Sequence, residues 1–260
     1  MTEGVGRQLA ARPAAPAPIA WRSATLAGAR PESATARTLA FDVPGWPGHL
    51  PGQHVVVRLR AEDGYTAQRS YSIASAPGVG AIELTVQRLP DGEVSPYLTD
   101  IIEPGDQVEI RGPIGSWFTW SPAASAPVQL IAGGSGIVPL MAMIRVADGT
   151  VPFRLLYSAR TPADVIYGDE LARRSDGSRL AVTYLFTRSV PPAAGAPAAP
   201  VSLSGRISAD VVAARTWAPD VSPTTYVCGP SGFVEAAADL LVAAGHPRPS
   251  IRTERFGPTS

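Results

Sequence analysis

The stretch that decides the fold runs from Ile131 to Pro139 and reads Ile-Ala-Gly-Gly-Ser-Gly-Ile-Val-Pro. It ends the apolar run Val128–Ala132, which predicts a buried strand, and it opens the helix-like segment Ile137–Val146. Glycines let the backbone approach a ligand in such a turn, and the N–H groups that start a helix favour a phosphate. The proline suits a first helical turn. Alone, the stretch is a weak signal, and the alternative is a tight strand–helix turn without a ligand.

Downstream of this turn, strand-like and helix-like segments alternate. This order predicts a parallel sheet with helices on both faces. A second turn, Cys228-Gly229-Pro230-Ser231-Gly232, would meet the first at the carboxyl ends of the strands, where ligands of open α/β sheets bind. The alternative for Cys228 is a small buried residue at a strand end. The expected strands are Phe153–Tyr157, Ala181–Phe186, Thr225–Cys228 and Ile251–Phe256, and the expected helices are Ala163–Arg174, Ser208–Arg215 and Gly232–Ala243.

Upstream, the hydrophobic residues follow a period of two. Ile82, Leu84 and Val86 alternate with polar residues, and two further runs, 39–43 and 55–59, repeat the pattern. Pro-Gly turns separate the runs, so we expect about six antiparallel strands between residues 21 and 111. Six strands in about 90 residues favour a small barrel or sandwich.

These two rhythms divide the chain. We expect a disordered Pro/Ala-rich tail at residues 1–18, a β-barrel at 19–123 and an α/β domain at 124–260. The Pro/Ala-rich stretch 189–204 interrupts the α/β order, and we expect it to be a mobile loop inserted in the second domain.

Composition excludes several classes of protein. The 22 basic and 22 acidic residues give zero net charge, which argues against nucleic-acid binding. One cysteine rules out an intrachain disulfide or a cysteine-ligated iron–sulfur cluster and fits a reducing, cytoplasmic location. The start of the chain lacks the apolar core of a signal peptide. The longest apolar stretch, 128–144, carries glycines and a proline in its middle, so no membrane span is expected. The three histidines are scattered, and we expect no metal site.

Five short motifs follow one another along the chain: Arg-Ser-Tyr-Ser at 69–72, Gly-Glu-Val-Ser at 92–95, Gly-Pro-Ile-Gly at 112–115, Gly-Gly-Ser-Gly-Ile-Val-Pro at 133–139 and Cys-Gly-Pro at 228–230. In this order the chain resembles the ferredoxin–NADP reductase superfamily over roughly residues 20–260. The resemblance implies an antiparallel Greek-key flavin-binding barrel followed by a parallel-sheet α/β nicotinamide-nucleotide domain. That fold agrees with the two rhythms.

The resemblance also implies roles for the first two motifs. Arg69 would pair with a flavin phosphate, since its guanidinium fork suits one. Tyr71 would stack on the isoalloxazine, and Ser72 would hydrogen-bond near flavin N5. Ser95, a good N-cap, and its helix N-terminus would hold the pyrophosphate, which implies FAD over FMN.

At the end of the chain, Glu254 would stand near the reacting atoms and Phe256 would cover the flavin face; the alternative for Phe256 is a plain core aromatic. The chain departs from the plant-type pattern because four residues follow this aromatic. The residues implied to act at the reacting centre are Ser72, Cys228, Glu254 and Phe256. Those implied to bind cofactors are Arg69, Ser70, Tyr71, Ser72, Gly92, Val94, Ser95, Gly133, Gly134, Ser135, Gly136, Ser158, Arg160, Arg188, Arg206, Cys228, Gly229 and Pro230.

Three arginines favour NADPH over NADH. An acid after the second strand would bind a ribose 2′-hydroxyl, but the chain has Ser158 and Arg160 there, with no acid before Asp164. Arg188 follows the third strand, and Arg206 stands in a Gly-Arg-Ile motif. Bacterial NADPH-dependent members of the family resemble this chain at all three positions. The competing interpretation pairs Arg160 with Asp164 and leaves NADH acceptable.

The resemblance predicts an oxidoreductase that moves a hydride from NADPH to bound FAD and passes electrons to a separate acceptor protein, such as a ferredoxin, a flavodoxin or an oxygenase component. The first alternative is a reductase of free flavin or another small molecule. The second is a regulatory module that binds flavin or nucleotide without turnover.

Overall fold

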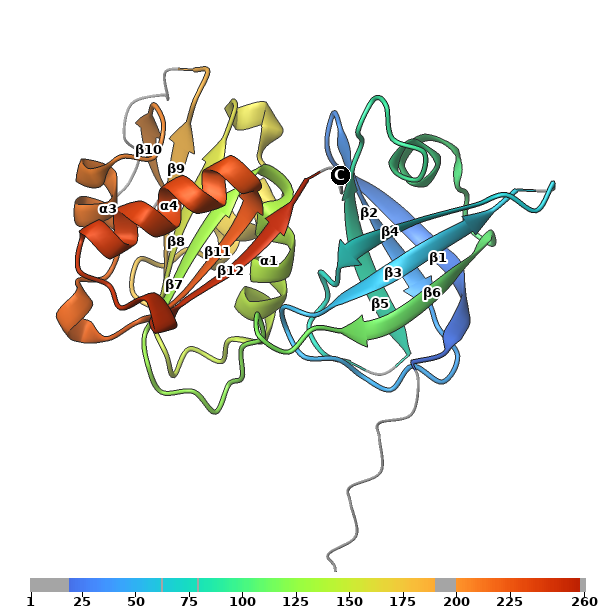
Figure 1. The fold of residues 1–260 in the computed structure, drawn as a ribbon, viewed down its shortest axis with the longest axis horizontal. Coiled ribbons are helices and arrows are strands. Elements are labelled where there is room, and N and C mark those ends of the chain that lie inside the picture. The colour runs from blue at the N-terminus through green and yellow to red at the C-terminus, as the bar shows by residue number, and fades with distance from the viewer. Residues whose placement is uncertain (1–18, 62, 79, 190–199, 258–260) are drawn as a thin grey trace, which may run out of the picture.

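The first domain is an antiparallel barrel. The computed structural model describes residues 19–61, 63–78, 80–189 and 200–257. Six strands pair in the order β4-β3-β6-β1-β2-β5, and the bridge between Ile73 and Leu84 joins the two ends of this sheet (Figure 1). The strands are β1 (Trp21–Ser33), β2 (Ala36–Asp42), β3 (His54–Arg60), β4 (Thr66–Ser72), β5 (Ala81–Gln87) and β6 (Gln107–Ile114).

Alternation along these strands fills the barrel interior. Leu39 and Phe41 of β2 and Ile82, Leu84 and Val86 of β5 are all fully buried, as their period of two predicts. A short helical segment after β5 includes a π-helical turn, Tyr97–Ile101, whose Leu98 also packs into this core. The expectation of about six antiparallel strands is confirmed.

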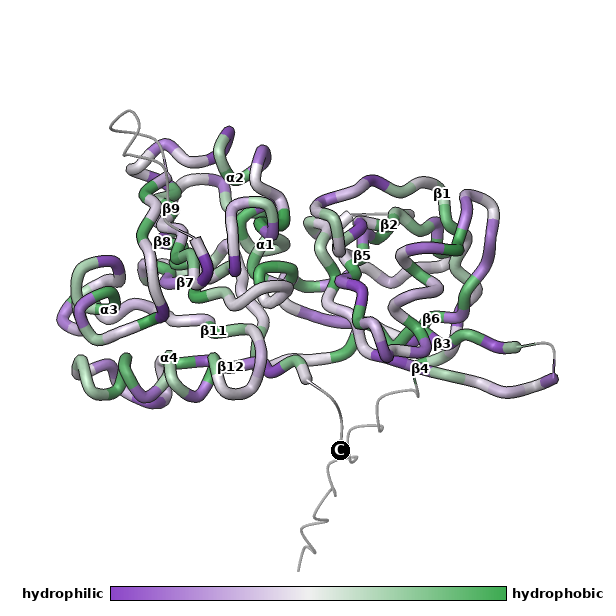
Figure 2. Tube along the Cα trace, turned by 90° about the horizontal axis from the view of Figure 1, so that it is seen from above, coloured by the Kyte–Doolittle hydropathy of each residue, from purple (hydrophilic) through white to green (hydrophobic). Residues whose placement is uncertain are grey.

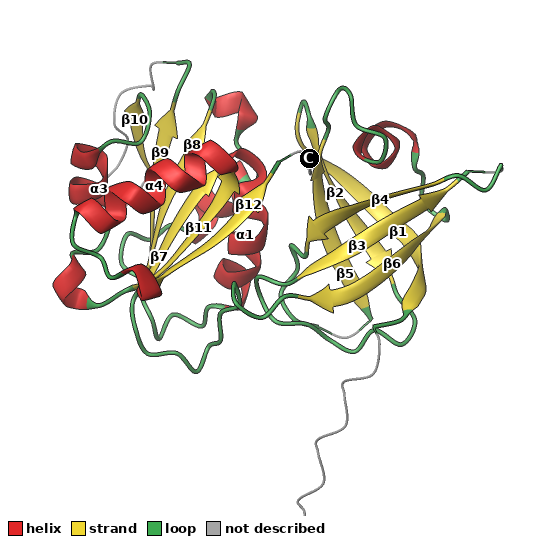
Figure 3. Cartoon of the chain, in the orientation of Figure 1, coloured by secondary structure: helices red, strands yellow, loops and turns green. Residues whose placement is uncertain are grey.

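The second domain is a parallel sheet of six strands in the order β10-β9-β8-β7-β11-β12, with helices on both faces (Figure 3). Its strands are β7 (Val128–Gly133), β8 (Phe153–Ala159), β9 (Leu180–Phe186), β10 (Val201–Ser204), β11 (Thr224–Pro230) and β12 (Ile251–Phe256). Its helices are α1 (Ile137–Val146), α2 (Gly168–Arg174), α3 (Ala209–Arg215) and α4 (Ser231–Ala243).

Two cores cover the two faces of this sheet. One contains α1 and α2 residues packed on alternate strand residues, and the other contains α3 and α4 residues packed on the remaining ones. Seen from above, the two helix pairs lie on opposite sides of the apolar strands β7, β8 and β9 (Figure 2). This arrangement confirms the predicted parallel sheet.

The structure corrects two element boundaries. Val201–Ser204 is strand β10, paired in parallel with β9, so a loop over these four residues is wrong. The helix expected at 163–174 begins only at Gly168, because Pro162–Asp164 form a separate 3₁₀ turn. The expected tail, 1–18, and residues 190–199 of the expected insertion lie outside the described residues.

An ion-pair network joins the two domains. Arg145 of α1, with 10% of its side chain exposed, donates through Nη1 to Glu83 of β5 at 2.7 Å and through Nη2 to Glu170 of α2 at 2.7 Å. Nη1 also donates to the carbonyl of Ala74 in the barrel at 2.9 Å. One guanidinium therefore ties α1 and α2 to the barrel.

A tyrosine adds to this junction. Tyr167, at the start of α2, has φ 63°, a left-handed conformation that is rare outside glycine. Its N–H donates to Glu32 of β1 at 3.2 Å, and its hydroxyl bonds Thr85 of β5. Thr85 bonds Thr38, whose hydroxyl also contacts Glu32 at 2.7 Å. Tyr167 of the second domain thus closes a ring of hydrogen bonds with Glu32, Thr38 and Thr85 of the barrel.

Candidate functional site

The end of β4 brings a buried hydroxyl to the seam between the domains. Ser72 is 4% exposed, and within the described part of the chain its Oγ has no hydrogen-bond partner. Its register partner on β3 is His54. A buried hydroxyl without a partner costs free energy, so this atom is suited to a hydrogen bond with a bound group.

A carboxyl group reaches the same seam from the other domain. Glu254 of β12 is in register with Cys228 of β11, and its Oε1 lies 3.8 Å from His54 Nδ1 of the barrel. Its Oε2 is buried and unpartnered among the described residues. Burial raises the pKa of Glu254 to about 7, because a charged carboxylate is poorly solvated there. This acid can therefore hold or release a proton near neutral pH.

Cys228 is fully buried in the core between the sheet and α1. Burial raises the pKa of its thiol well above the usual value, and the nearby Glu254 raises it further. The thiol is therefore neutral at physiological pH. Since Cys228 and Glu254 share one face of the sheet, the structure brings these two predicted residues together with Ser72. Phe256, also on β12, is half-buried against the core beneath α1.

Arg69 and Tyr71 lie on β4, upstream of Ser72. Arg69 is half-exposed and forms an ion pair with Glu93 at 3.4 Å, and Glu93 also accepts a hydrogen bond from Tyr65 at 2.7 Å. Tyr71 is half-buried against the barrel core. Burial raises its pKa, so its hydroxyl stays neutral. Ser70, between them, is exposed.

The Gly-Glu-Val-Ser stretch corrects one expectation. Ser95 does not cap a helix, because it is already helical and its Oγ accepts the N–H of Leu89 at 3.1 Å. A Cβ on Gly92 would lie 2.8 Å from Ser95 Oγ, so this tight loop requires glycine there. The side chain of Val94 is buried in the barrel core, which leaves only its backbone for a ligand.

The two glycine turns of the second domain touch each other. A Cβ on Gly136 would lie 2.1 Å from the carbonyl oxygen of Cys228, and one on Gly133 would lie 2.6 Å from the Phe233 ring. Close packing therefore explains these two glycines without a ligand. Gly134 differs: it has φ 55° and no atom closer than 3.9 Å to an added Cβ, so its surface is open. Ser135 beside it is half-buried, and Pro230, at the start of α4, is exposed.

Three predicted arginines follow three adjacent strands. Arg160, Arg188 and Arg206 come after β8, β9 and β10, and the N–H of Arg188 donates to the carbonyl of Arg160 at 2.8 Å. All three are exposed, and in the described ranges none forms an ion pair. Ser158, near the end of β8, is half-buried.

The competing interpretation of Arg160 is not supported. Asp164 instead accepts hydrogen bonds from the N–H and the hydroxyl of Thr161, which together form a capping box. Arg160 is therefore left available for a ligand.

The comparisons with known proteins match both halves of this arrangement. The model of the oxidoreductase FAD-binding domain matches residues 23–119, and that of the oxidoreductase NAD-binding domain matches residues 130–239. The chain belongs to the ferredoxin–NADP reductase superfamily. A flavin and a nicotinamide nucleotide are thus the cofactors of this fold, as the sequence motifs predict.

Among its relatives is the reductase component of propane 2-monooxygenase from Rhodococcus jostii, 33% identical over 79% of this chain and 55% of the relative. The chain therefore spans little more than half the length of that protein. Among solved structures, the ferredoxin reductase in carbazole 1,9a-dioxygenase has a TM-score of 0.76 and 25% identity, covering 94% of this chain and 71% of that one. The FAD/NAD-binding domain of a nitric oxide dioxygenase from Vibrio cholerae has a TM-score of 0.78 and 23% identity, covering 91% and 99%.

The residues at the seam fit the cofactors of this superfamily. The unpartnered Ser72 Oγ, the unpartnered Glu254 Oε2 and the open backbone of Gly134 all belong to groups that a bound ligand can satisfy. His54 is the member of the site that sequence reasoning missed. A single histidine on an alternating strand gives no signal, because its importance depends on a carboxyl group two hundred residues away.

The described residues contain no helix that is long and apolar enough to cross a membrane. They also contain no group of three or more His, Cys, Asp or Glu side chains placed to hold a metal ion.

Proposed function

We propose that this chain transfers reducing equivalents from NADPH through bound FAD to a separate acceptor. The observation that carries the proposal is a pair of buried oxygens, Ser72 Oγ and Glu254 Oε2, that have no partner among the described residues. They come from the flavin-type and the nucleotide-type domain, and both residues neighbour His54: Ser72 is its register partner, and Glu254 Oε1 lies 3.8 Å from its Nδ1. A bound ligand between the domains could supply the hydrogen bonds that these buried oxygens lack. The boundaries 19–123 and 124–260 are proposed for the two units, and the single buried cysteine is compatible with a cytoplasmic location.

The chain's own residues would bind and orient the cofactors. When bound, flavin and nicotinamide supply the hydride chemistry. Arg69 would exchange its exposed partner Glu93 for a flavin phosphate, since an arginine fork binds phosphate in bidentate fashion. Tyr71 would stack beside the ring, and Ser72 would donate a hydrogen bond at its reactive edge. The loop of Gly92, Val94 and Ser95 would offer backbone N–H groups to the pyrophosphate.

The second domain would position the nicotinamide nucleotide. Gly133, Gly134, Ser135 and Gly136 would lie under its pyrophosphate, with Gly134 open to the ligand. Cys228, Gly229 and Pro230 would border the nicotinamide. Glu254 would hold or release a proton beside the reacting atoms, and Phe256 would exclude water from the flavin face.

We propose NADPH as the preferred donor because Arg160, Arg188 and Arg206 gather at one edge of the sheet with no carboxylate partner in the described ranges. A ribose 2′-phosphate supplies the missing negative charge. Ser158 would contact the same ribose. Anaerobic mixing with NADPH and with NADH, followed at the flavin absorbance band, tests this assignment. Fast bleaching by NADPH alone supports it, and equal bleaching by both contradicts it.

The acceptor is proposed as a ferredoxin, a flavodoxin or an oxygenase component, because relatives are named reductase components of monooxygenases. A retained flavin is required of such a protein, whereas a reductase of free flavin releases it. The variant Arg69→Ala should therefore lose FAD on desalting while the wild type keeps it. Unchanged FAD content in the variant would contradict the phosphate assignment, and a wild type that keeps no FAD would favour free flavin as the acceptor.

A further inference from the structure

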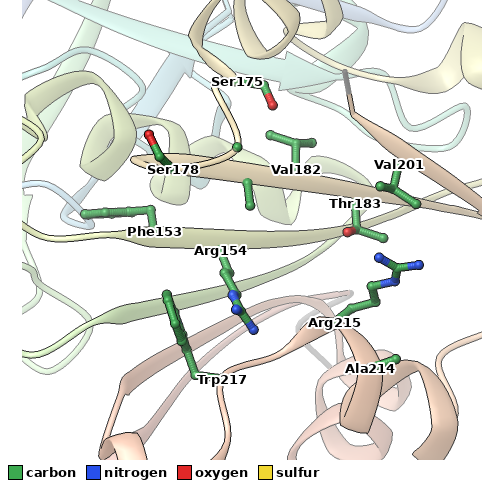
Figure 4. A pocket seen from close by; sticks show the side chains of 12 residues that line it. Phe153, Arg154, Ser175, Ser178, Val182, Thr183, Val201, Ala214, Arg215 and Trp217 are labelled. Atoms are coloured by element: carbon green, nitrogen blue, oxygen red, sulfur yellow. The ribbon is translucent and has the colours of Figure 1, made fainter. Parts of the chain in front are cut away.

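A cavity of about 300 Å³ opens in the second domain at the end of the sheet opposite the nucleotide arginines. Arg154, near the start of β8, lines it, whereas Arg160 follows the end of the same strand. Figure 4 shows Arg215 reaching from α3 toward Thr183 and Val201, with the Trp217 ring beside Arg154. Neither the proposed hydride transfer nor its cofactors use this cavity.

The charges around the cavity do not balance. Arg154 and Arg215 line it, no lining residue is acidic, and across the described ranges neither arginine forms an ion pair. Asp176 is a chain neighbour of the lining residues, but its Oδ1 accepts the N–H groups of residues 178–180 within its own turn. The sequence of residues 190–199 contains no acid that could neutralise them. Two guanidinium groups therefore share a concave site without a counter-charge.

Two hydrogen-bond donors beside the cavity also have no partner in the part of the chain that the structure describes. Nε of Arg215 and Nε1 of Trp217 are buried, and each lacks a partner among the described residues. Among the residues that the structure describes, the Arg154 side chain donates only through Nη1, to the carbonyl of Thr216 at 2.8 Å. Its guanidinium carbon lies 3.8 Å from the centre of the Trp217 ring. Arginine held flat on an aromatic ring is preorganised, so little entropy is lost when its remaining donors bind an oxyanion.

The rest of the lining combines apolar side chains with the hydroxyl groups of Ser175, Ser178 and Thr183. Phe153, Val182 and Val201 form walls around the two arginines. The volume lies at the lower end of the range for small-molecule sites and is larger than an inorganic ion needs.

We infer that this cavity binds a small organic anion. Its carboxylate or phosphate group contacts the guanidinium groups of Arg154 and Arg215, and its hydrocarbon part packs on Phe153 and Val182. The site is separate from the redox centre, so the inference stands independently of the proposed function.

Calorimetric titration of the FAD-loaded protein, with no nicotinamide nucleotide present, tests the inference. The probes are benzoate and phenyl phosphate, which distinguish the two head groups, with benzyl alcohol as the uncharged analogue and inorganic phosphate as the bare ion. We expect saturable binding of benzoate or phenyl phosphate, and at least about tenfold weaker binding of benzyl alcohol and of inorganic phosphate, since each lacks one half of the recognised ligand.

Variants locate the binding. Arg215→Gln and, separately, Arg154→Gln should each weaken binding at least about tenfold, because each removes a charged hydrogen-bond partner. Arg248→Gln removes the same charge from an exposed side chain just before β12 and should leave the affinity unchanged, whereas Arg160→Gln reports any binding of the probes at the nucleotide end. FAD content and melting temperature establish that each variant is folded. The inference is overturned if neither organic anion binds saturably, if inorganic phosphate binds equally well, or if Arg160→Gln weakens binding while folded Arg154 and Arg215 variants do not.

Discussion

Replacing Arg145 by methionine should cost more stability than any exposed arginine substitution in the chain. The guanidinium of Arg145 is the shared partner of Glu83 in the barrel and Glu170 in α2, at 2.7 Å from each. Methionine keeps the aliphatic length and the packing but removes every donor. Both carboxylates, 26% and 21% exposed, would then remain partly buried with less compensation.

The magnitude follows from what each carboxylate retains. Removing one partner of a buried ion pair costs about 3–5 kcal/mol. Glu83 keeps Arg30 at 2.6 Å, and Glu170 keeps Arg174 at 2.9 Å, so the lower end applies. We expect Arg145→Met to lower the free energy of unfolding by about 3 kcal/mol, a large share of the usual 5–15 kcal/mol.

Urea denaturation of the FAD-free protein at pH 7 measures this loss. The matched control is Arg174→Met, which removes an exposed partner of the same Glu170 across one helical turn. That change should cost about 0.5 kcal/mol or less. A loss for Arg145→Met no larger than that of the control would refute the view that the buried guanidinium holds the domains together.

The stability difference between the wild type and Arg145→Met should also depend on pH. Burial alone would raise the pKa of Glu83 and of Glu170, but the arginines around each carboxyl lower it below the usual value. A depressed folded-state pKa contributes stability above the unfolded value of about 4.5 and loses it as the pH falls through the folded value. The gap between wild type and Arg145→Met should therefore narrow below pH 4.5.

Three further outcomes are expected. Glu254→Gln should stabilise the FAD-free protein at pH 8 by up to about 3 kcal/mol and have little effect at pH 4. The reason is that the folded-state pKa of Glu254 is raised to about 7, so ionising this carboxyl costs stability as the pH rises from 4.5 to 7. A stability difference in urea denaturation that does not depend on pH would contradict this. Gly136→Ala should lower the melting temperature of the protein both with and without FAD, since its Cβ would lie 2.1 Å from the carbonyl oxygen of Cys228. An unchanged melting temperature would show that the two glycine turns can move apart. The double variant Arg160→Ala with Arg206→Ala should raise KM for NADPH far more than for NADH in steady-state assays, and equal increases would exclude both from 2′-phosphate recognition.

The sequence allowed most of the elements to be predicted because their hydrophobic periods are clean. Helix Ile137–Val146 and strand Ile251–Phe256 were predicted to the residue. The errors arose where composition misleads. Val201–Ser204 is short, exposed in part and preceded by prolines and alanines, so nothing local distinguishes it from a loop; it becomes a strand only because the edge of β9 offers it hydrogen bonds.

The candidate site was predictable in part. The family resemblance pointed to Ser72 and Cys228 through the ordered motifs and to Glu254 through the Glu-Arg-Phe stretch, and the structure places these three at one seam. Ser95 was misjudged as a helix cap because serine before a helix usually caps it, whereas here the Leu89 N–H competes for the same oxygen. His54 could not be found, since its significance rests on a contact between domains.

The junction of the domains shows most clearly why such contacts escape sequence reasoning. No sequence motif marks Glu83, Arg145 or Glu170, and each is of a residue type that is ordinarily found on the surface. Only the docked domains turn them into one network, which links the barrel that carries Ser72 to the domain that carries Glu254. A hydride transfer requires its reacting atoms at near-contact distance, and an ångström of misplacement is costly. The ion pairs of Arg145, remote from the reacting atoms, are therefore expected to matter for the rate as well as for stability, and Arg145→Met should slow flavin reduction even in the fraction that remains folded.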